Sequence, residues 1–230
     1  MFYIKDLKVS YGESQVIGNL DLELQKGEIL AVMGRNGMGK TTLFKSLIGI
    51  LGCGSGSSIK IDDSELSSEP SFQRVRKGLA YVPQGRMIFP NMTVTDNIRT
   101  GLDSSEEKVV PDYVYELFPV LKEMGKRKGG NLSGGQQQQL AIARALVTKP
   151  KVLLLDEPTE GIQPSIIKEM AEKLKTIRDM HEVSIIVAEQ VLSFALTACD
   201  RFLVMEGGAI VHSSDRSEVD ADKIKSFLSV

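Results

Sequence analysis

The 230-residue sequence predicts an α/β domain with a mostly parallel sheet, to which an antiparallel β part and a helical insert are added. Short, wholly apolar runs at residues 29–33 and 152–155 predict the parallel sheet, because strands covered on both faces have this pattern. Apolar residues at helical spacing follow both runs. Looser alternation of apolar and polar residues near the N-terminus predicts the antiparallel part. At this length we expect one compact unit over residues 1–230.

The predicted strands are residues 2–9, 16–24, 29–33, 58–61, 79–82, 152–155, 184–187, 202–205 and 210–212, with 58–61 at a sheet edge. Helices are predicted after Lys40, after Gly135, and over 166–180 and 191–198. Residues 84–130 contain prolines and apolar residues at helical spacing but no strand pattern. We therefore interpret 84–130 as a helical insert, and 1–83 with 131–230 as the core.

Composition narrows the classes of function. The 28 basic and 30 acidic residues give a net charge of -2, so charge gives no reason to expect nucleic acid as a partner. No run approaches the roughly 18–20 apolar residues of a membrane helix, and no secretory signal is recognisable. We expect a cytoplasmic chain that contacts a membrane only through partners. Cys53 and Cys199 stand far apart, which disfavours a disulfide framework or a zinc site.

A glycine-rich loop separates the strand at 29–33 from the helix that follows. Its sequence, Gly34-Arg35-Asn36-Gly37-Met38-Gly39-Lys40-Thr41, has the G-x-x-x-x-G-K-[ST] pattern of a phosphate-binding loop. Backbone N–H groups in such a loop approach phosphate oxygens, with Lys40 beside the β- and γ-phosphates and the Thr41 hydroxyl on Mg²⁺. A plain glycine turn, the alternative, needs neither side chain. The predicted ATP-binding residues are Gly34, Asn36, Gly37, Gly39, Lys40, Thr41 and Thr42.

Two acidic residues end the apolar strand at 152–155. Asp156 and Glu157 would lie at the carboxyl edge of the sheet, where open α/β sheets bind ligands. We predict that Asp156 helps to hold Mg²⁺ and that Glu157 polarises the water that attacks the γ-phosphorus. The alternative is that both acids simply cap the structure before Pro158.

The segment Leu132-Ser133-Gly134-Gly135-Gln136 opens a predicted helix and resembles the LSGGQ signature of ABC ATPases. A hydroxyl and glycine N–H groups at a helix N-terminus form a second anion site. The resemblance covers nearly the whole chain and implies the ABC ATPase fold. It also implies a head-to-tail dimer, in which Ser133, Gly134, Gly135 and Gln136 contact the ATP on the other subunit. An ordinary helix cap is the alternative for this segment.

Further roles follow from the resemblance alone. Tyr11 corresponds to an aromatic residue that stacks on adenine, and Gln84 to a glutamine that contacts Mg²⁺ and the attacking water. A core tyrosine and a plain loop glutamine are the respective alternatives. The insert that begins at Gln84 corresponds to the part that docks on transmembrane permease subunits.

The chain departs from the family pattern at two places. Gln190 stands where most members have a histidine near the γ-phosphate. It is the predicted catalytic substitute because an amide can also donate a hydrogen bond to phosphate. Unlike histidine, however, an amide cannot carry a charge. Neither His181 nor His212 can replace it by sequence order, and both are predicted at the surface. Residues 160–163 read Glu-Gly-Ile-Gln instead of the usual Ser-Ala-Leu-Asp, which leaves Gln163 as a substitute for the usual aspartate.

These departures point to one branch of the family. Residues 82–90, 116–121 and 156–165 resemble ATPase subunits of branched-chain amino acid importers. Within that group, the run Gly-Gly-Asn-Leu-Ser-Gly-Gly-Gln-Gln-Gln-Gln at 129–139 and Gln163 resemble the ATPase subunits of urea importers. The resemblance implies an ATPase at the inner face of the cell membrane, paired with a second ABC ATPase subunit, which powers uptake of urea or short amides. A branched-chain amino acid importer and a nucleotide-regulated binding module outside transport are the alternatives.

Overall fold

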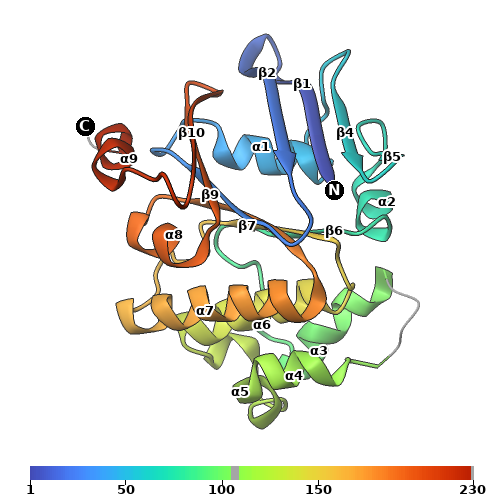
Figure 1. Ribbon diagram of the computed structural model, residues 1–230. Helices are drawn as coiled ribbons and strands as arrows, with labels where there is room; N and C mark the ends of the chain where they lie inside the picture. The colour runs from blue at the N-terminus through green and yellow to red at the C-terminus, as the bar shows by residue number, and fades with distance from the viewer. Residues whose placement is uncertain (105–108, 229–230) are drawn as a thin grey trace.

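The computed structural model describes residues 1–104 and 109–228. Two sheets are stacked with helix α1 (Lys40–Leu47) between them, and further helices cover the other face of the second sheet (Figure 1). Apolar side chains form one core on each face of this second sheet. The core on the α1 side joins the two sheets, and the other core joins the second sheet to the remaining helices.

The first sheet is antiparallel. It contains β1 (Phe2–Tyr11), β2 (Ser14–Leu24), β4 (Ser58–Ile61) and β5 (Ser64–Glu65), in the order β2-β1-β4-β5. Along β1 the buried residues change phase between Ile4 and Leu7, where the pairing with β2 is irregular and Asp6 has φ 50°. The prediction that 58–61 lies at an edge is wrong. The two-residue strand β5 pairs with its outer side, and so short a strand leaves no pattern in the sequence.

The second sheet is parallel except at one edge, as predicted. Its strands are β3 (Ile29–Met33), β6 (Leu79–Val82), β7 (Val152–Asp156), β8 (Ser184–Glu189), β9 (Arg201–Glu206) and β10 (Ala209–Asp215). Their order is β10-β9-β3-β8-β7-β6, and β10 pairs antiparallel with β9. Every residue of β3, β7 and β8 is buried, which is why these strands read as continuous apolar runs. The order places the carboxyl ends of β3, β8 and β7 side by side.

The remaining helices are α2 (Ser71–Arg76), α3 (Val94–Arg99), α4 (Asp112–Leu117), α5 (Pro119–Glu123), α6 (Gly134–Leu146), α7 (Pro164–His181), α8 (Leu192–Ala198) and α9 (Ala221–Leu228). Short 3-10 helices are η1 (Thr100–Ser104) and η2 (Gly129–Asn131). The sequence did not predict α2 or α9. In α2 the buried Arg74 donates to the carbonyl oxygens of Ser46 and Leu47 in the last turn of α1, where helix carbonyl groups lack intrahelical partners of the usual kind.

Residues 84–130 hold α3, η1, α4, α5 and the first two residues of η2, and the described part of this segment contains no strand apart from one isolated bridge between Thr93 and Lys128. Its apolar side chains share a core with α6, α7 and the second sheet. The insert therefore has no separate core, and its boundaries at 84 and 130 stay a prediction. His181, predicted at the surface, is half-buried: its ring centre lies 4.2 Å from that of Tyr113, and its Nε2 atom is buried.

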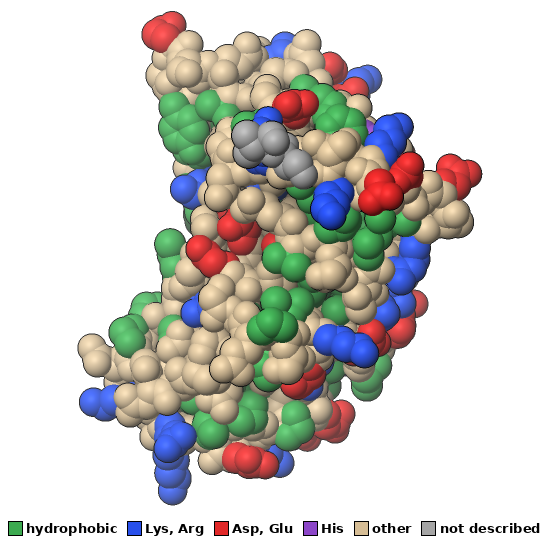
Figure 2. Space-filling model, turned by 90° about the vertical axis from the view of Figure 1, so that its left-hand side faces the viewer, with side chains coloured by type: hydrophobic (Ala, Val, Ile, Leu, Met, Phe, Trp, Pro, Cys, Tyr) green, Lys and Arg blue, Asp and Glu red, His purple; other side chains and the backbone are tan. Residues whose placement is uncertain are grey.

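Charge is spread over the surface. On the face shown in Figure 2, basic and acidic side chains are interspersed and neither sign forms a large patch. This distribution agrees with the net charge of -2. Within 1–104 and 109–228, no helix has the length and apolar character to cross a membrane.

Candidate functional site

The loop between β3 and α1 has a backbone that requires glycine. Gly37 and Gly39 have φ values of 81° and 104°, which side chains of L-residues rarely tolerate. A Cβ atom at Gly34 would lie 2.5 Å from the carbonyl oxygen of Met205 on β9. The loop is thus held tightly against the sheet, and its curvature leaves N–H groups available to an anion.

Lys40 lies at the centre of this loop, with only 4% of its side chain exposed. Its ammonium group donates to the carbonyl oxygens of Gly34 at 2.6 Å and Arg35 at 3.0 Å, and it lies 3.6 Å from Oε1 of Glu157. Burial lowers the pKa of Lys40, while the Glu157 and Asp156 carboxylates act in the opposite direction. A desolvated cation in this position suits the charged oxygens of a phosphate.

Thr41 and Asp156 meet beside Lys40. The Thr41 hydroxyl donates to Oδ1 of Asp156 at 3.3 Å, and the Tyr81 hydroxyl donates to Oδ2 at 3.1 Å. Burial raises the pKa of Asp156, and the two hydroxyl donors partly offset this rise. A hydroxyl and one carboxylate fit Mg²⁺, which prefers oxygen ligands and keeps several waters or substrate phosphates. Within the described residues, no cluster of three acidic, histidine or cysteine side chains offers another metal site.

Glu157 follows β7 in a strained backbone conformation, with φ 47°. Its N–H group donates to the carbonyl oxygen of Ala188 on β8 at 2.9 Å. Gln84 donates to Oε2 at 3.2 Å, and Gln190 donates to Oε1 at 3.0 Å. The structure therefore brings the three predicted catalytic residues together. Gln84 contacts Glu157 rather than Asp156, the predicted Mg²⁺ ligand.

Gln190 also reaches the phosphate loop, where it donates to Oδ1 of Asn36 at 2.7 Å. The buried Glu189 holds the turn that presents Gln190. It accepts from the N–H groups of Gln190 and Val191 and from the Thr159 hydroxyl. Sequence reasoning missed Tyr81, which lies inside an apolar strand and has no distinguishing signal in the local pattern. It also missed Glu189, although an acid at the end of an apolar strand is the signal that Asp156 gives.

The segment Ser133–Gln136 begins α6 with a capping box, in which Ser133 and Gln136 exchange hydrogen bonds. Cβ atoms at Gly134 and Gly135 would lie 2.9 Å from the Gly161 carbonyl oxygen and 2.8 Å from Ile166. The neighbours of this segment are thus the turn after Glu157 and the start of α7, rather than the chain's own phosphate loop. Ser133 remains exposed.

Tyr11 and Thr42 complete the predicted nucleotide-binding set. Tyr11 ends β1 with 48% of its surface exposed, so its ring is free to contact a ligand. Thr42 lies half-buried in the first turn of α1, next to Thr41. Their roles remain predictions.

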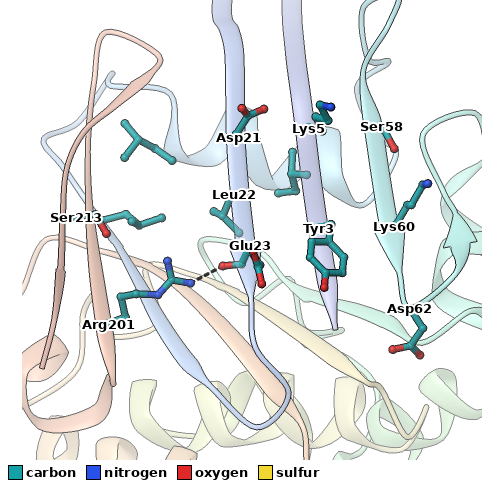
Figure 3. A pocket seen from close by; sticks show the side chains of 13 residues that line it. Tyr3, Lys5, Asp21, Leu22, Glu23, Ser58, Lys60, Asp62, Arg201 and Ser213 are labelled. Atoms are coloured by element: carbon teal, nitrogen blue, oxygen red, sulfur yellow. Dashed lines mark hydrogen bonds between the residues drawn. The ribbon is translucent and has the colours of Figure 1, made fainter.

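A separate hollow of about 740 Å³ lies on the outer face of the antiparallel sheet (Figure 3). Tyr3, Lys5, Glu23 and Lys60 line it from neighbouring strands, and Arg201 approaches it from β9. None of the phosphate-loop residues contributes to its lining. Its size alone does not make it the active site, because the donors, cation and carboxylates suited to a nucleotide converge elsewhere.

Replacing Gln190 by Ala is expected to lower kcat for ATP hydrolysis about tenfold, because Glu157 loses a donor and its link to Asn36. ATP affinity should change little. Gln190→His should retain a donor and add a pH-dependent limb near pH 6.5, which wild type lacks at this position. Steady-state rates between pH 5.5 and 8.5 would check this, with the exposed Gln15→Ala as control. Wild-type turnover by Gln190→Ala would contradict it.

Comparison with known proteins agrees with the site. The sequence model of the family described as ABC transporter matches residues 17–160. The high-affinity branched-chain amino acid transport ATP-binding protein BraG of Pseudomonas aeruginosa is 43% identical over 204 residues, 87% of either chain. The probable branched-chain amino acid transport ATP-binding protein LivF of Archaeoglobus fulgidus is 35% identical, covering 93% of this chain and 91% of its own.

Solved structures show the same fold. An ATP-binding cassette of an ABC transporter in its ADP conformation has a TM-score of 0.81 and 23% identity, covering 99% of this chain and 94% of that one. A dimeric bacterial ABC transporter cassette has a TM-score of 0.82 and 21% identity, covering 94% and 99%. The predicted α/β architecture is thereby confirmed. By its phosphate loop, its sheet order and these relatives, the chain belongs to the ABC transporter family and is one of its ATPase subunits.

Proposed function

We propose that this chain hydrolyses ATP to power an importer of branched-chain amino acids. The observation that carries the proposal is the similarity to BraG and LivF over nearly the full length of all three chains. The cluster around Lys40 and Glu157 supports the ATPase part. The choice of substrate rests on the relatives, because the transported molecule does not contact an ATPase subunit of this kind.

In this proposal each residue of the site has a role. Lys40 and the loop N–H groups bind the phosphates, and Thr41 and Asp156 hold Mg²⁺, which neutralises phosphate charge when it is bound. Glu157 orients the attacking water and accepts its proton. Gln84 and Gln190 hold the Glu157 carboxylate on both oxygens, which keeps it directed toward the loop.

Ser133, Gly134, Gly135 and Gln136 complete the nucleotide site of a second ATPase subunit. This role is supported by the neighbours of Gly134 and Gly135, which are Gly161 and Ile166. The partner is either another copy of this chain or a related ATPase. The dimeric cassette described above shows that this fold occurs as a dimer.

The permease subunits dock beside the insert. A groove of about 440 Å³ lies between β6, α6 and the loop after Gln84, and its lining includes Tyr81, Phe89 and Arg144. Met87 and Phe89 expose 68% and 46% of their surface there. Neighbouring large apolar side chains with this much exposure are typical of a surface that binds another protein. Docking here would place this chain on the inner face of the membrane, in the cytoplasm.

Urea is the second candidate substrate. The run at 129–139, which ends in four glutamines, and Gln163 favour it by resemblance to urea importers. The comparisons do not support this narrower assignment, since the relatives named above serve branched-chain amino acid transport. We therefore place branched-chain amino acids first, which reverses the order that the sequence motifs favoured.

Uptake of labelled leucine is expected to fall when cells lose this chain, and to return with the wild-type chain but not with Lys40→Ala. Labelled urea, measured in the same cells, distinguishes the two substrates. Loss of urea uptake alone would overturn the amino acid assignment in favour of urea. If neither uptake changes, the chain does not serve either importer.

A further inference from the structure

Arg86 lies where three functional segments meet. It belongs to the loop that follows Gln84 at the start of the insert, and its guanidinium donates through Nη2 to the carbonyl oxygen of Glu160 at 2.6 Å. Cβ atoms at Gly161 and Gly134 would lie 3.4 and 3.5 Å from the same nitrogen. Arg86 is thus hydrogen-bonded to the turn that follows Glu157 and lies beside the first residue of α6.

The turn that Arg86 contacts begins at Glu157. Glu160 donates its N–H to the Glu157 carbonyl oxygen at 3.2 Å, so these two residues form one turn. The side of the turn that faces the sheet is held by hydrogen bonds: the Glu157 N–H group donates to the Ala188 carbonyl oxygen, and the Thr159 hydroxyl donates to the Glu189 carboxylate. On the opposite side, the carbonyl oxygen of Glu160 is held by Arg86. A shift of Arg86 would therefore be transmitted to the backbone that sets the direction of Glu157.

Arg86 is itself fixed by the groove. Arg144 on α6 donates to the Arg86 carbonyl oxygen at 3.1 Å, and the Arg144 guanidinium lies 5.5 Å from the ring centre of Phe89. Arg86 and Met87 have φ values of 66° and 45°, a conformation that is costly unless its surroundings impose it. A protein that binds in the groove and displaces Phe89 or Met87 would therefore act on a segment whose backbone is already strained.

We propose that Arg86 is a positioning residue that couples the groove of the insert to Glu157. Through its contact with Glu160, it sets the placement of the Glu157 turn against the start of α6. Its side chain is hydrogen-bonded to Glu160, and its carbonyl oxygen to Arg144. The inference rests on the proposed function only for the identity of the partner that binds in the groove. The effect of Arg86 on the Glu157 turn applies to the isolated ATPase as well.

The test compares Arg86→Gln and Arg86→Lys with Arg99→Gln, which changes an exposed arginine of the same insert. ATP affinity, kcat, KM and the unfolding midpoint are measured on the isolated chain, and stimulation of hydrolysis on the chain assembled with its permease. We expect Arg86→Gln to lower kcat at least about tenfold, because small misplacements of a catalytic group are costly. KM, affinity and the midpoint should match wild type. Arg86→Lys keeps a donor on its side chain and should have a kcat between those of Arg86→Gln and wild type. Arg99→Gln should have the kcat of wild type.

In the assembled importer, Arg86→Gln should also lose the stimulation that wild type shows. Wild-type kcat and stimulation in Arg86→Gln would overturn the inference. So would a lowered midpoint or weakened ATP binding in both Arg86 variants, because the arginine would then be merely structural. If the wild-type chain hydrolyses ATP but no permease stimulates it, the proposed function fails, and kcat of the isolated Arg86 variants still decides the positioning role.

Discussion

Glu157→Gln is expected to reduce ATP hydrolysis by at least about a hundredfold, the scale on which a positioned general base contributes. Glutamine keeps the shape of the side chain but cannot accept the proton of the attacking water. ATP binding should survive, because Lys40 and the loop are unchanged. The variant should therefore accumulate in the ATP-bound dimer, which cannot reopen by hydrolysis.

Two measurements check this expectation: phosphate release in the steady state, and molecular mass by light scattering with and without ATP and Mg²⁺. Glu218→Gln is the control, since it makes the same change at an exposed side chain in the segment between β10 and α9. A monomeric Glu157→Gln variant with wild-type turnover would show that another residue activates the water.

Lys40→Ala is expected to weaken ATP binding by at least about a hundredfold, or about 2.7 kcal/mol. The substitution removes the one ammonium group that the structure holds inside the loop. Nucleotide-free protein should unfold at or above the wild-type temperature, because burial already disfavours this charge, as the lowered pKa of Lys40 indicates. ATP should then raise the unfolding temperature of wild type far more than that of the variant.

Calorimetric titration and thermal unfolding over a series of ATP concentrations would measure both effects. Lys45→Ala is the control, because it removes a lysine from the same helix away from the loop. Equal stabilisation of Lys40→Ala and wild type by ATP would place the phosphates elsewhere.

Local sequence was informative wherever one segment supplies a complete function. The loop from Gly34 to Thr41 combines glycine geometry, cation and hydroxyl within eight residues, and the strands around it are recognisable because they are apolar throughout. Ser133 and Gln136 form the predicted helix start for the same reason, since a capping box joins residues three apart. Family resemblance added Gln84 and Gln190, whose side chains the structure places on Glu157.

Substrate assignment shows a limit of motif reasoning. The run at 129–139, which ends in four glutamines, and Gln163 favoured urea, whereas relatives similar along nearly the whole chain favour branched-chain amino acids. The glutamines of this run lie on α6, where Gln138 and Gln139 are buried. Side chains in that position pack within the subunit, so their identity says little about a molecule that crosses the membrane through other subunits.

The sequence by itself determined the parallel-sheet class, the phosphate loop, the acidic pair after β7 and the helical character of the insert. Only the tertiary structure decided the inner position of β4, the Tyr81 contact with Asp156 and the Arg86 contact with Glu160. These contacts join residues 75 and 74 positions apart. The physical reason is that period and spacing report on neighbours along the chain, whereas the partner of a hydroxyl or guanidinium depends on which strands and loops the packed core brings together.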